Sequence, residues 1–331
     1  MRRNDMLREW VGGRWLELML LVGFGAIVVW LGILASPMVK PYVVPVVDNV
    51  REFILRPRGP DFDGRAAFRH AEAQMKIGPR ETGSEGSRRT AEYINRVLQQ
   101  NGWAVEYQNF TYRGAAGRNI IARAGQGRGP VAIIGAHYDT RLYADNDPDS
   151  RLRQQPVPGA NDGASGAAVL LELSRSLDKT KLSNEVWLVF FDAEDNGRIN
   201  GWEFIAGSTH MAENLTVTPA FVVIADMVGD KDLQLYKEKN STPALVEHIW
   251  QIAARLGYSD TFLPTEKYSM IDDHTPFLRA GIPAVDIIDF DYPYWHTTQD
   301  TLDKLAPESL KRVGRVIEVL LEDGSWSTEG R

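Results

Sequence analysis

The chain has 331 residues, of which 44% are hydrophobic and 24% charged, a globular composition that excludes disordered and collagen-like proteins. It carries 37 Lys and Arg against 44 Asp and Glu, a net charge of -7, and has no long basic cluster. Nucleic acid is therefore not an expected partner. The sequence has no cysteine, which excludes disulfide scaffolds, thiolate zinc sites, iron–sulfur clusters and cysteine nucleophiles. Any metal must be held by His, Asp or Glu.

Near the N-terminus, an uncharged and mainly apolar run extends from Leu18 to Val39, long enough to cross a membrane as one helix. A cleaved signal peptide and a buried core helix are the alternatives, but a signal peptide usually has a shorter apolar stretch. We therefore expect a membrane anchor, followed by a linker marked by prolines. The predicted order is a cytoplasmic tail, the anchor, the linker, a folded domain and a C-terminal tail, at residues 1–15, 16–39, 40–64, 65–322 and 323–331.

The charges that flank the apolar run indicate its orientation. Four arginines precede it, whereas Lys40 is the only positive residue immediately after it. Positive residues are retained on the cytoplasmic side of membrane spans. This asymmetry favours a single-pass membrane protein whose folded domain lies outside the cytoplasm.

From about residue 65 the sequence alternates between helical and strand patterns. The predicted helices are 65–75, 84–101, 164–177, 203–213, 243–256 and 307–321, with a further helix start near Thr275. The predicted strands are 105–112, 119–122, 131–136, 185–191, 221–225 and 284–288. This alternation predicts a single three-layer α/β/α domain with a mostly parallel central sheet.

Acidic and imidazole side chains follow the predicted buried strands or begin the helices after them. They are His137, Asp162, Glu194, Asp195, Asp226 and His296. Ligands of such sheets bind beyond the carboxyl ends of the strands, so these side chains should meet at one edge. Oxygen and imidazole ligands without thiolate suit a catalytic zinc ion. Each residue alone could instead cap a helix or pair with Arg, as Asp162 could cap the helix that follows it.

Several segments occur in one order between residues 65 and 322: GAHYDT, PGANDGASGAAVLLEL, FFDAEDNG, ADMVGD, DDHTPF, IPAVDIID and WHTTQDTLDK. This series resembles the zinc exopeptidases of metallopeptidase family 28 and, more closely, the glutaminyl cyclases of animal-like type that share their fold. The resemblance implies a sheet between layers of helices, with one catalytic zinc in the cyclases and two in the aminopeptidases.

The resemblance also assigns the metal-binding and proton-transferring residues. It makes Asp162, Asp195 and His296 the ligands of the catalytic zinc and Glu194 the general acid/base. In an aminopeptidase, a second metal would be held by His137 and Asp226, with Asp162 bridging the two ions.

Around these ligands, the resemblance implies further roles. Asp226 and Asp272 match the carboxyls that hydrogen-bond around the catalytic glutamate of cyclases, and Trp202 and Trp295 match the aromatic residues that flank the substrate. The chain departs from animal cyclases at Ala136, because they have a disulfide there and this chain has no cysteine.

Three classes of function remain open from the sequence. The first is a cyclase that converts N-terminal glutamine of peptides to pyroglutamate with release of ammonia; Asp272 and Trp295 favour it, since simple aminopeptidases commonly have other residues there. The second is a zinc aminopeptidase, in which Glu194 would activate water. The third is a non-enzymatic membrane ectodomain, but such domains lose metal ligands, and this chain keeps them all. In either enzyme, peptide or protein N-termini are the expected substrates.

Overall fold

The computed structural model of the chain describes residues 61–324 and residue 326. The predicted anchor at 16–39 lies outside the described residues, as do the cytoplasmic tail, most of the linker at 40–64 and most of the C-terminal tail. None of the described helices is long and apolar enough to cross a membrane. The membrane anchor and its orientation therefore remain predictions from the sequence.

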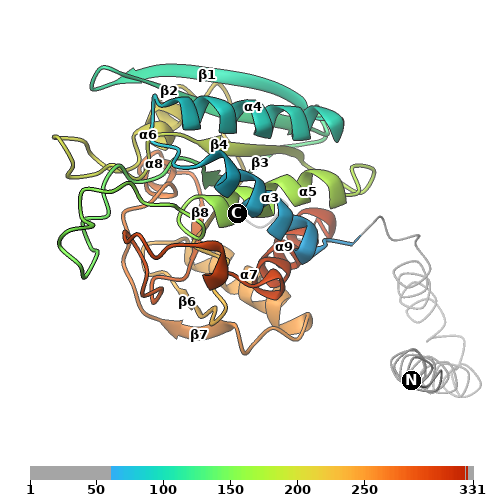
Figure 1. The fold of residues 1–331 in the computed structure, drawn as a ribbon. Helices are drawn as coiled ribbons and strands as arrows, with labels where there is room; N and C mark the ends of the chain where they lie inside the picture. Colours follow the sequence, from blue (N-terminus) through green and yellow to red (C-terminus); the bar gives the residue numbers. More distant parts are fainter. Residues whose placement is uncertain (1–60, 325, 327–331) are drawn as a thin grey trace, which may run out of the picture. The chain divides into compact units, whose positions relative to one another are not determined.

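A six-stranded sheet forms the centre of the domain, in the order β1-β2-β4-β3-β5-β8 (Figure 1). Its strands are β1 Ala104–Tyr112, β2 Ala115–Ala124, β3 Val131–His137, β4 Glu185–Phe191, β5 Phe221–Asp226 and β8 Ala284–Ile288. Strands β4, β3, β5 and β8 pair in parallel. The expectation of a mostly parallel sheet is confirmed by these four strands, and the antiparallel strands β1 and β2 at the other edge make the sheet mixed. Only two residues join β1 to β2, and so short a connection requires antiparallel strands.

Helices cover both faces of the sheet. They are α3 Gly64–Ile77, α4 Glu85–Gln100, α5 Ala164–Ser176, α6 Ala206–Glu213, α7 Pro243–Arg255, α8 Thr275–Arg279 and α9 Pro307–Glu322. Residues of α3, α4, α5, α7 and α9 share one apolar core with the sheet, and α3, α5 and α9 contact one another (Figure 1). The short helices α6 and α8 contribute Met211 and Phe277 to the core on the other face. The three-layer arrangement expected from the sequence is confirmed.

Strand β4 shows why the central strands have continuous apolar sequences. Successive side chains of a strand point to opposite faces of the sheet. Leu188 and Phe190 belong to the core under the larger helix layer, whereas Trp187, Val189 and Phe191 belong to the core under α6 and α8. Because both faces of the strand are covered, neither set of side chains faces water. The alternation of apolar and polar residues that is typical of a half-exposed strand is therefore lost.

Two short strands are absent from the sequence-based prediction. Strands β6 Leu235–Lys237 and β7 Phe262–Glu266 form a separate two-stranded parallel sheet. Strand β6 has three residues, too few for a period to be recognised, and β7 contains Pro264, which usually argues against a strand. A 3₁₀ helix at Leu302–Lys304 is also new.

The central strands should contribute most to stability. Ile134 on β3 is fully buried, whereas Val217 is 42% exposed. We expect Ile134→Ala to lower the free energy of unfolding by about 2–5 kcal/mol, because it removes buried methyl groups and leaves a cavity. Val217→Ala should change it by less than about 0.5 kcal/mol. Urea denaturation of the two variants measures this difference, and equal losses would contradict the placement of β3 at the centre of the core.

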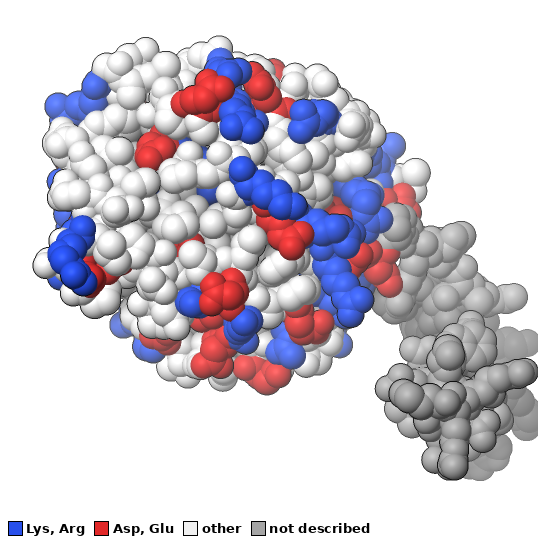
Figure 2. Space-filling view, in the orientation of Figure 1, with Lys and Arg blue, Asp and Glu red and all other residues white. Residues whose placement is uncertain are grey.

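The surface charge is distributed rather than concentrated. On the face shown in Figure 2, Lys and Arg side chains lie beside Asp and Glu side chains over most of the described surface.

Candidate metal centre

The polar residues predicted from the strand ends come together at the carboxyl edge of the parallel strands. His137 and Asp226 are the last residues of β3 and β5. Asp195 lies four residues beyond the end of β4, and Asp162 lies two residues before α5. His296 comes from the loop after β8. Parallel strands bring these segments to one edge although they are distant in the sequence.

The ligand atoms form two groups that share Asp162, and within each group they lie within 4.8 Å of one another. His137 Nε2 lies 3.1 Å from Asp162 Oδ1 and 3.2 Å from Asp226 Oδ1. His296 Nε2 lies 2.8 Å from Asp195 Oδ1 and 3.6 Å from Asp162 Oδ2. The two oxygens of Asp162 thus face two different histidines, as a carboxylate between two cation positions would.

The residues present fit a bound zinc ion. Asp162 Oδ2, Asp195 Oδ2 and His137 Nδ1 are buried and have no hydrogen-bond partner among the described residues. Unpaired polar atoms in a protein interior are costly, and buried charges are usually paired or bound to metal. A cation would satisfy the two carboxylate oxygens, and carboxylate with imidazole is a donor set that zinc accepts. Asp162, Asp195 and His296 together supply three ligands, as a catalytic zinc site requires.

Backbone contacts fix Asp162 in this position. The carboxylate of Asp300 accepts hydrogen bonds from the N–H groups of Asn161 and Asp162 at 2.8 and 3.1 Å. Gly163 has a φ of 93°, and a Cβ there would lie 2.5 Å from the carbonyl oxygen of Asp139. Gly163 is also the N-cap of α5, which has no side-chain cap hydrogen bond. The alternative that Asp162 serves only as the cap of this helix is therefore wrong.

A tight turn after β4 separates the neighbours Glu194 and Asp195. Ala193 has a φ of 62°, in the left-handed region that residues other than glycine rarely adopt. The carboxylate of Asp139 accepts hydrogen bonds from the N–H groups of Glu194 and Asp195 at 3.1 and 3.2 Å. Asp195 reaches His296, whereas Glu194 belongs to neither ligand group. Glu194 is thus available for proton transfer.

Glu194 is only 7% exposed, and burial raises the pKa of its carboxyl well above the usual range. The charge of His137 opposes this shift, while the neighbouring carboxyls of Asp272, Asp195 and Asp273 increase it. A carboxyl with a raised pKa can hold and release a proton near neutral pH.

The two further carboxyls predicted around Glu194 are also buried. Burial raises the pKa of Asp226 to about 7; His137 opposes the shift and Asp272 adds to it. Asp272 is 3% exposed, and its N–H donates to Thr275 Oγ1 at the start of α8. Helix α8 therefore holds the segment that brings Asp272 toward Glu194.

The two predicted tryptophans lie in different surroundings. Trp295 stacks on His296, with ring centroids 3.7 Å apart. Trp202 makes an edge contact with Tyr112 at 5.2 Å. Phe204, two residues later, faces His296 at 6.5 Å with an interplanar angle of 15°. Phe204, which the sequence analysis missed, is thus a second aromatic neighbour of His296 beside Trp295.

Other residues that the sequence analysis missed act on the predicted ligands. Asp139 and Asp300 hold the backbone of the ligand segments, as described above, and Arg141 donates to the carbonyl oxygen of Asp195. The role of Asp139 could have been predicted, because this residue stands two residues after His137 at a strand end. The roles of Asp300 and Arg141 depend on loop paths that have no periodic pattern.

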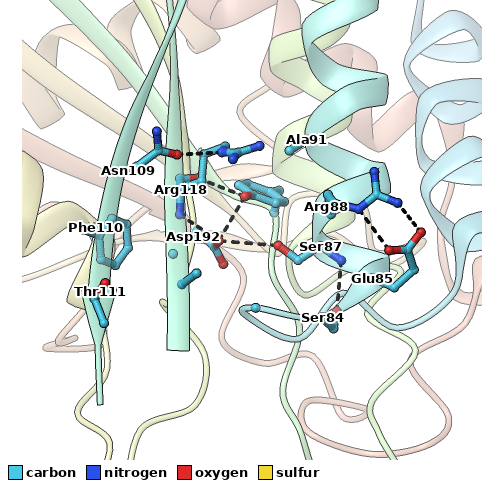
Figure 3. A pocket seen from close by; sticks show the side chains of 14 residues that line it. Ser84, Glu85, Ser87, Arg88, Ala91, Asn109, Phe110, Thr111, Arg118 and Asp192 are labelled. Carbon is cyan, nitrogen blue, oxygen red and sulfur yellow. Dashed lines mark hydrogen bonds and ion pairs between the residues drawn. The ribbon is translucent and has the colours of Figure 1, made fainter. Parts of the chain in front are cut away.

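A cavity of about 520 Å³ lies between the start of α4 and strands β1 and β2 (Figure 3). None of the predicted metal ligands lines it. At its base, Asp192 accepts hydrogen bonds from the Arg118 N–H at 3.0 Å, the Tyr138 hydroxyl at 3.1 Å and the Ser87 hydroxyl at 3.4 Å. Asp192 therefore anchors the segment that leads into Glu194.

Similar proteins include both cyclases and aminopeptidases. A glutaminyl-peptide cyclotransferase-like protein of Bos taurus is 25% identical over 289 residues, which cover 74% of this chain and 72% of that protein. The crystal structure of Bacteroides thetaiotaomicron glutaminyl cyclase bound to N-acetylhistamine is 30% identical, with a TM-score of 0.76, covering 80% of this chain and 99% of that chain. The structure of a leucine aminopeptidase precursor from the same organism is 30% identical, with a TM-score of 0.75 and the same coverage.

A family model accounts for most of the domain that contains these residues. Residues 119–321 match the model described as peptidase family M28. The match begins on β2 and ends in α9, so it includes every predicted ligand. Because it spans more than half of the sequence, the chain belongs to peptidase family M28.

Proposed function

We propose that the chain is a zinc-dependent glutaminyl-peptide cyclotransferase, which converts the N-terminal glutamine of peptides and proteins to pyroglutamate. The observation that carries this proposal is the environment of Glu194. This carboxyl is buried, lies outside both ligand groups and has its pKa raised partly by the charge of Asp272. Cyclisation needs one group that takes a proton from an amine and returns a proton to departing ammonia.

The reaction joins two parts of one substrate residue. The α-amine nitrogen of glutamine attacks its own γ-amide carbon, a carbon–nitrogen bond closes the five-membered ring, and the bond to the amide nitrogen breaks. Glu194 takes the proton lost by the amine and donates it to the leaving nitrogen, which departs as ammonia. Zinc held by Asp162, Asp195 and His296 would supply Lewis-acid polarisation of the γ-carbonyl.

Positioning of the substrate also contributes to the rate. An attack within one molecule becomes fast when the reacting atoms are held in the right geometry. Trp295 lies against the ligand His296 and is partly exposed, so its ring offers an apolar surface beside the metal centre. We infer that it packs against the methylene groups of the glutamine side chain.

A second candidate function is a zinc aminopeptidase, which the second ligand group supports. His137, Asp226 and Asp162 could hold another zinc ion, and two-metal sites have ions about 3.5–4 Å apart. In that case Glu194 would take a proton from the water that attacks the peptide bond. A non-enzymatic domain is the third possibility, but the ligand groups are complete for an enzyme.

Two peptides that differ only in the first residue test the proposal. The purified full-length chain, loaded with zinc, is incubated with a peptide that begins with glutamine and a matched peptide that begins with leucine, and products are followed by mass. We expect loss of one ammonia from the first peptide and no change in the second. Release of free leucine would instead show an aminopeptidase, and no reaction with either peptide by the zinc-loaded chain would favour a non-enzymatic domain.

A further inference from the structure

A buried arginine lies behind the Asp195 and His296 side of the metal centre. Arg141 is only 2% exposed and stands four residues after His137, on the loop that leaves β3. Burial of a guanidinium group is costly unless its donors are satisfied. The proposed reaction gives Arg141 no chemical step, so its burial requires another explanation.

The contacts of Arg141 connect three parts of the centre. Its Nε and Nη2 each donate to one carboxylate oxygen of Asp145 at 2.7 Å, a two-point pairing. Its Nη1 donates to the carbonyl oxygen of Asp195 at 2.5 Å, and Nη2 also donates to that of Gly197 at 3.2 Å. One side chain therefore fixes the backbone of a predicted ligand and the orientation of a nearby carboxylate.

The carboxylate of Asp145 lies beside His296, on the side of the ring opposite to Asp195 and Asp162. Asp145 Oδ1 lies 3.8 Å from His296 Nδ1, while Nε2 of the same ring points toward Asp195 and Asp162. A carboxylate behind a metal-binding histidine fixes the ring and its tautomer. The Asp145 side chain is 45% exposed and would be free to turn into solvent without the pairing to Arg141.

A ring contact adds a third connection to the same ligand. The guanidinium of Arg141 lies 5.6 Å from the centroid of the Phe204 ring, and Phe204 in turn faces His296. Cations are attracted to aromatic faces at this distance. Arg141 therefore acts on His296 from two sides, through Asp145 and through Phe204.

We propose that Arg141 is a positioning residue of the metal centre, which holds Asp195 and His296 in the arrangement that binds zinc. The two ligands are 101 residues apart in the sequence, so their loops must be fixed relative to each other. Ligands that are ordered before binding lose less conformational entropy when the ion arrives. The inference rests on the zinc of the proposed function, but not on whether the reaction is cyclisation or hydrolysis.

Zinc affinity of the full-length chain tests this inference, with a matched control on the same loop. Arg151 also pairs with an aspartate, Asp149, but its side chain is 86% exposed. We expect Arg141→Met to weaken zinc binding by about 10–100-fold, measured by competition with a chelator, and to change the absorption spectrum of the cobalt-substituted protein. Arg151→Met should leave both properties unchanged. A folded Arg141→Met variant with unchanged affinity and spectrum would overturn the inference.

Two further variants separate positioning from charge and from folding. Arg141→Lys keeps the charge but lacks the planar fork, so it should bind zinc almost as weakly as Arg141→Met. Full affinity in Arg141→Lys would show that charge alone suffices and would overturn the positioning role. If Arg141→Met does not fold, Asp145→Asn tests the inference in its place. We expect this variant to bind zinc more weakly than the wild type, and unchanged zinc binding would contradict the inference. A wild-type chain that binds no zinc would refute the proposed function itself, whereas equal binding by wild type and variants would refute only this inference.

Discussion

Replacement of Glu194 by glutamine should lower the rate of pyroglutamate formation by about 100- to 10,000-fold and leave the bound zinc in place. Glutamine has nearly the shape of glutamate but cannot take up the proton of the attacking amine. Glu194 belongs to neither group of predicted ligands, so its replacement removes no metal-binding atom. The rate is measured as ammonia release at a saturating peptide concentration. The zinc content of the same sample shows whether the metal is retained.

Glu203 provides the control for this experiment. It lies on the same loop as Glu194 and is exposed. Glu203→Gln makes the same chemical change and should retain the wild-type rate. Full turnover by zinc-loaded Glu194→Gln would remove Glu194 from the mechanism, and equal losses in both variants would point to an effect on the loop instead.

Asp162→Asn is expected to lose zinc altogether, whether the wild-type chain holds one ion or two. Asp162 is the only residue shared by the two ligand groups, and its oxygens face His137 and His296. Zinc requires the ionised carboxylate, so the neutral amide removes a ligand and its charge. The loss of affinity should exceed the roughly 10–100-fold typical of residues that only support a ligand.

Zinc per chain after dialysis against metal-free buffer measures this prediction. Asp303→Asn makes the same substitution at a side chain that is 68% exposed, and this variant should keep the wild-type zinc content. Retention of wild-type zinc by Asp162→Asn would show that the metal centre is assigned to the wrong residues.

The fold was predictable where local patterns are long and where both faces of an element are covered. Strand β4 was bounded correctly, because its apolar run is interrupted by polar residues at both ends. Helix α6 starts at Ala206 rather than at the predicted 203, since Ile205 adopts a left-handed conformation with a φ of 59°. The sequence analysis gave no direction for β1 and β2, although the short segment between them indicates an antiparallel pair.

The site was predictable for residues fixed by strand ends and unpredictable for residues fixed by loops. His137 and Asp226 end parallel strands, and topology alone brings them together. The loop after Asp195 contains left-handed residues at Arg198 and Asn200, so its path cannot be read from spacing. That is why the sequence analysis missed Phe204 as an aromatic neighbour of His296.

The fate of one oxygen atom tests the central claim most directly. The zinc-loaded full-length chain is incubated in water labelled with heavy oxygen (oxygen-18) with a peptide that begins with glutamine. The masses of the products are then measured by mass spectrometry. Cyclisation by the substrate's own amine predicts a product that has lost one ammonia and contains no heavy oxygen. A free N-terminal amino acid together with a shortened peptide, with heavy oxygen in the new carboxyl group, would show hydrolysis and contradict the cyclase assignment.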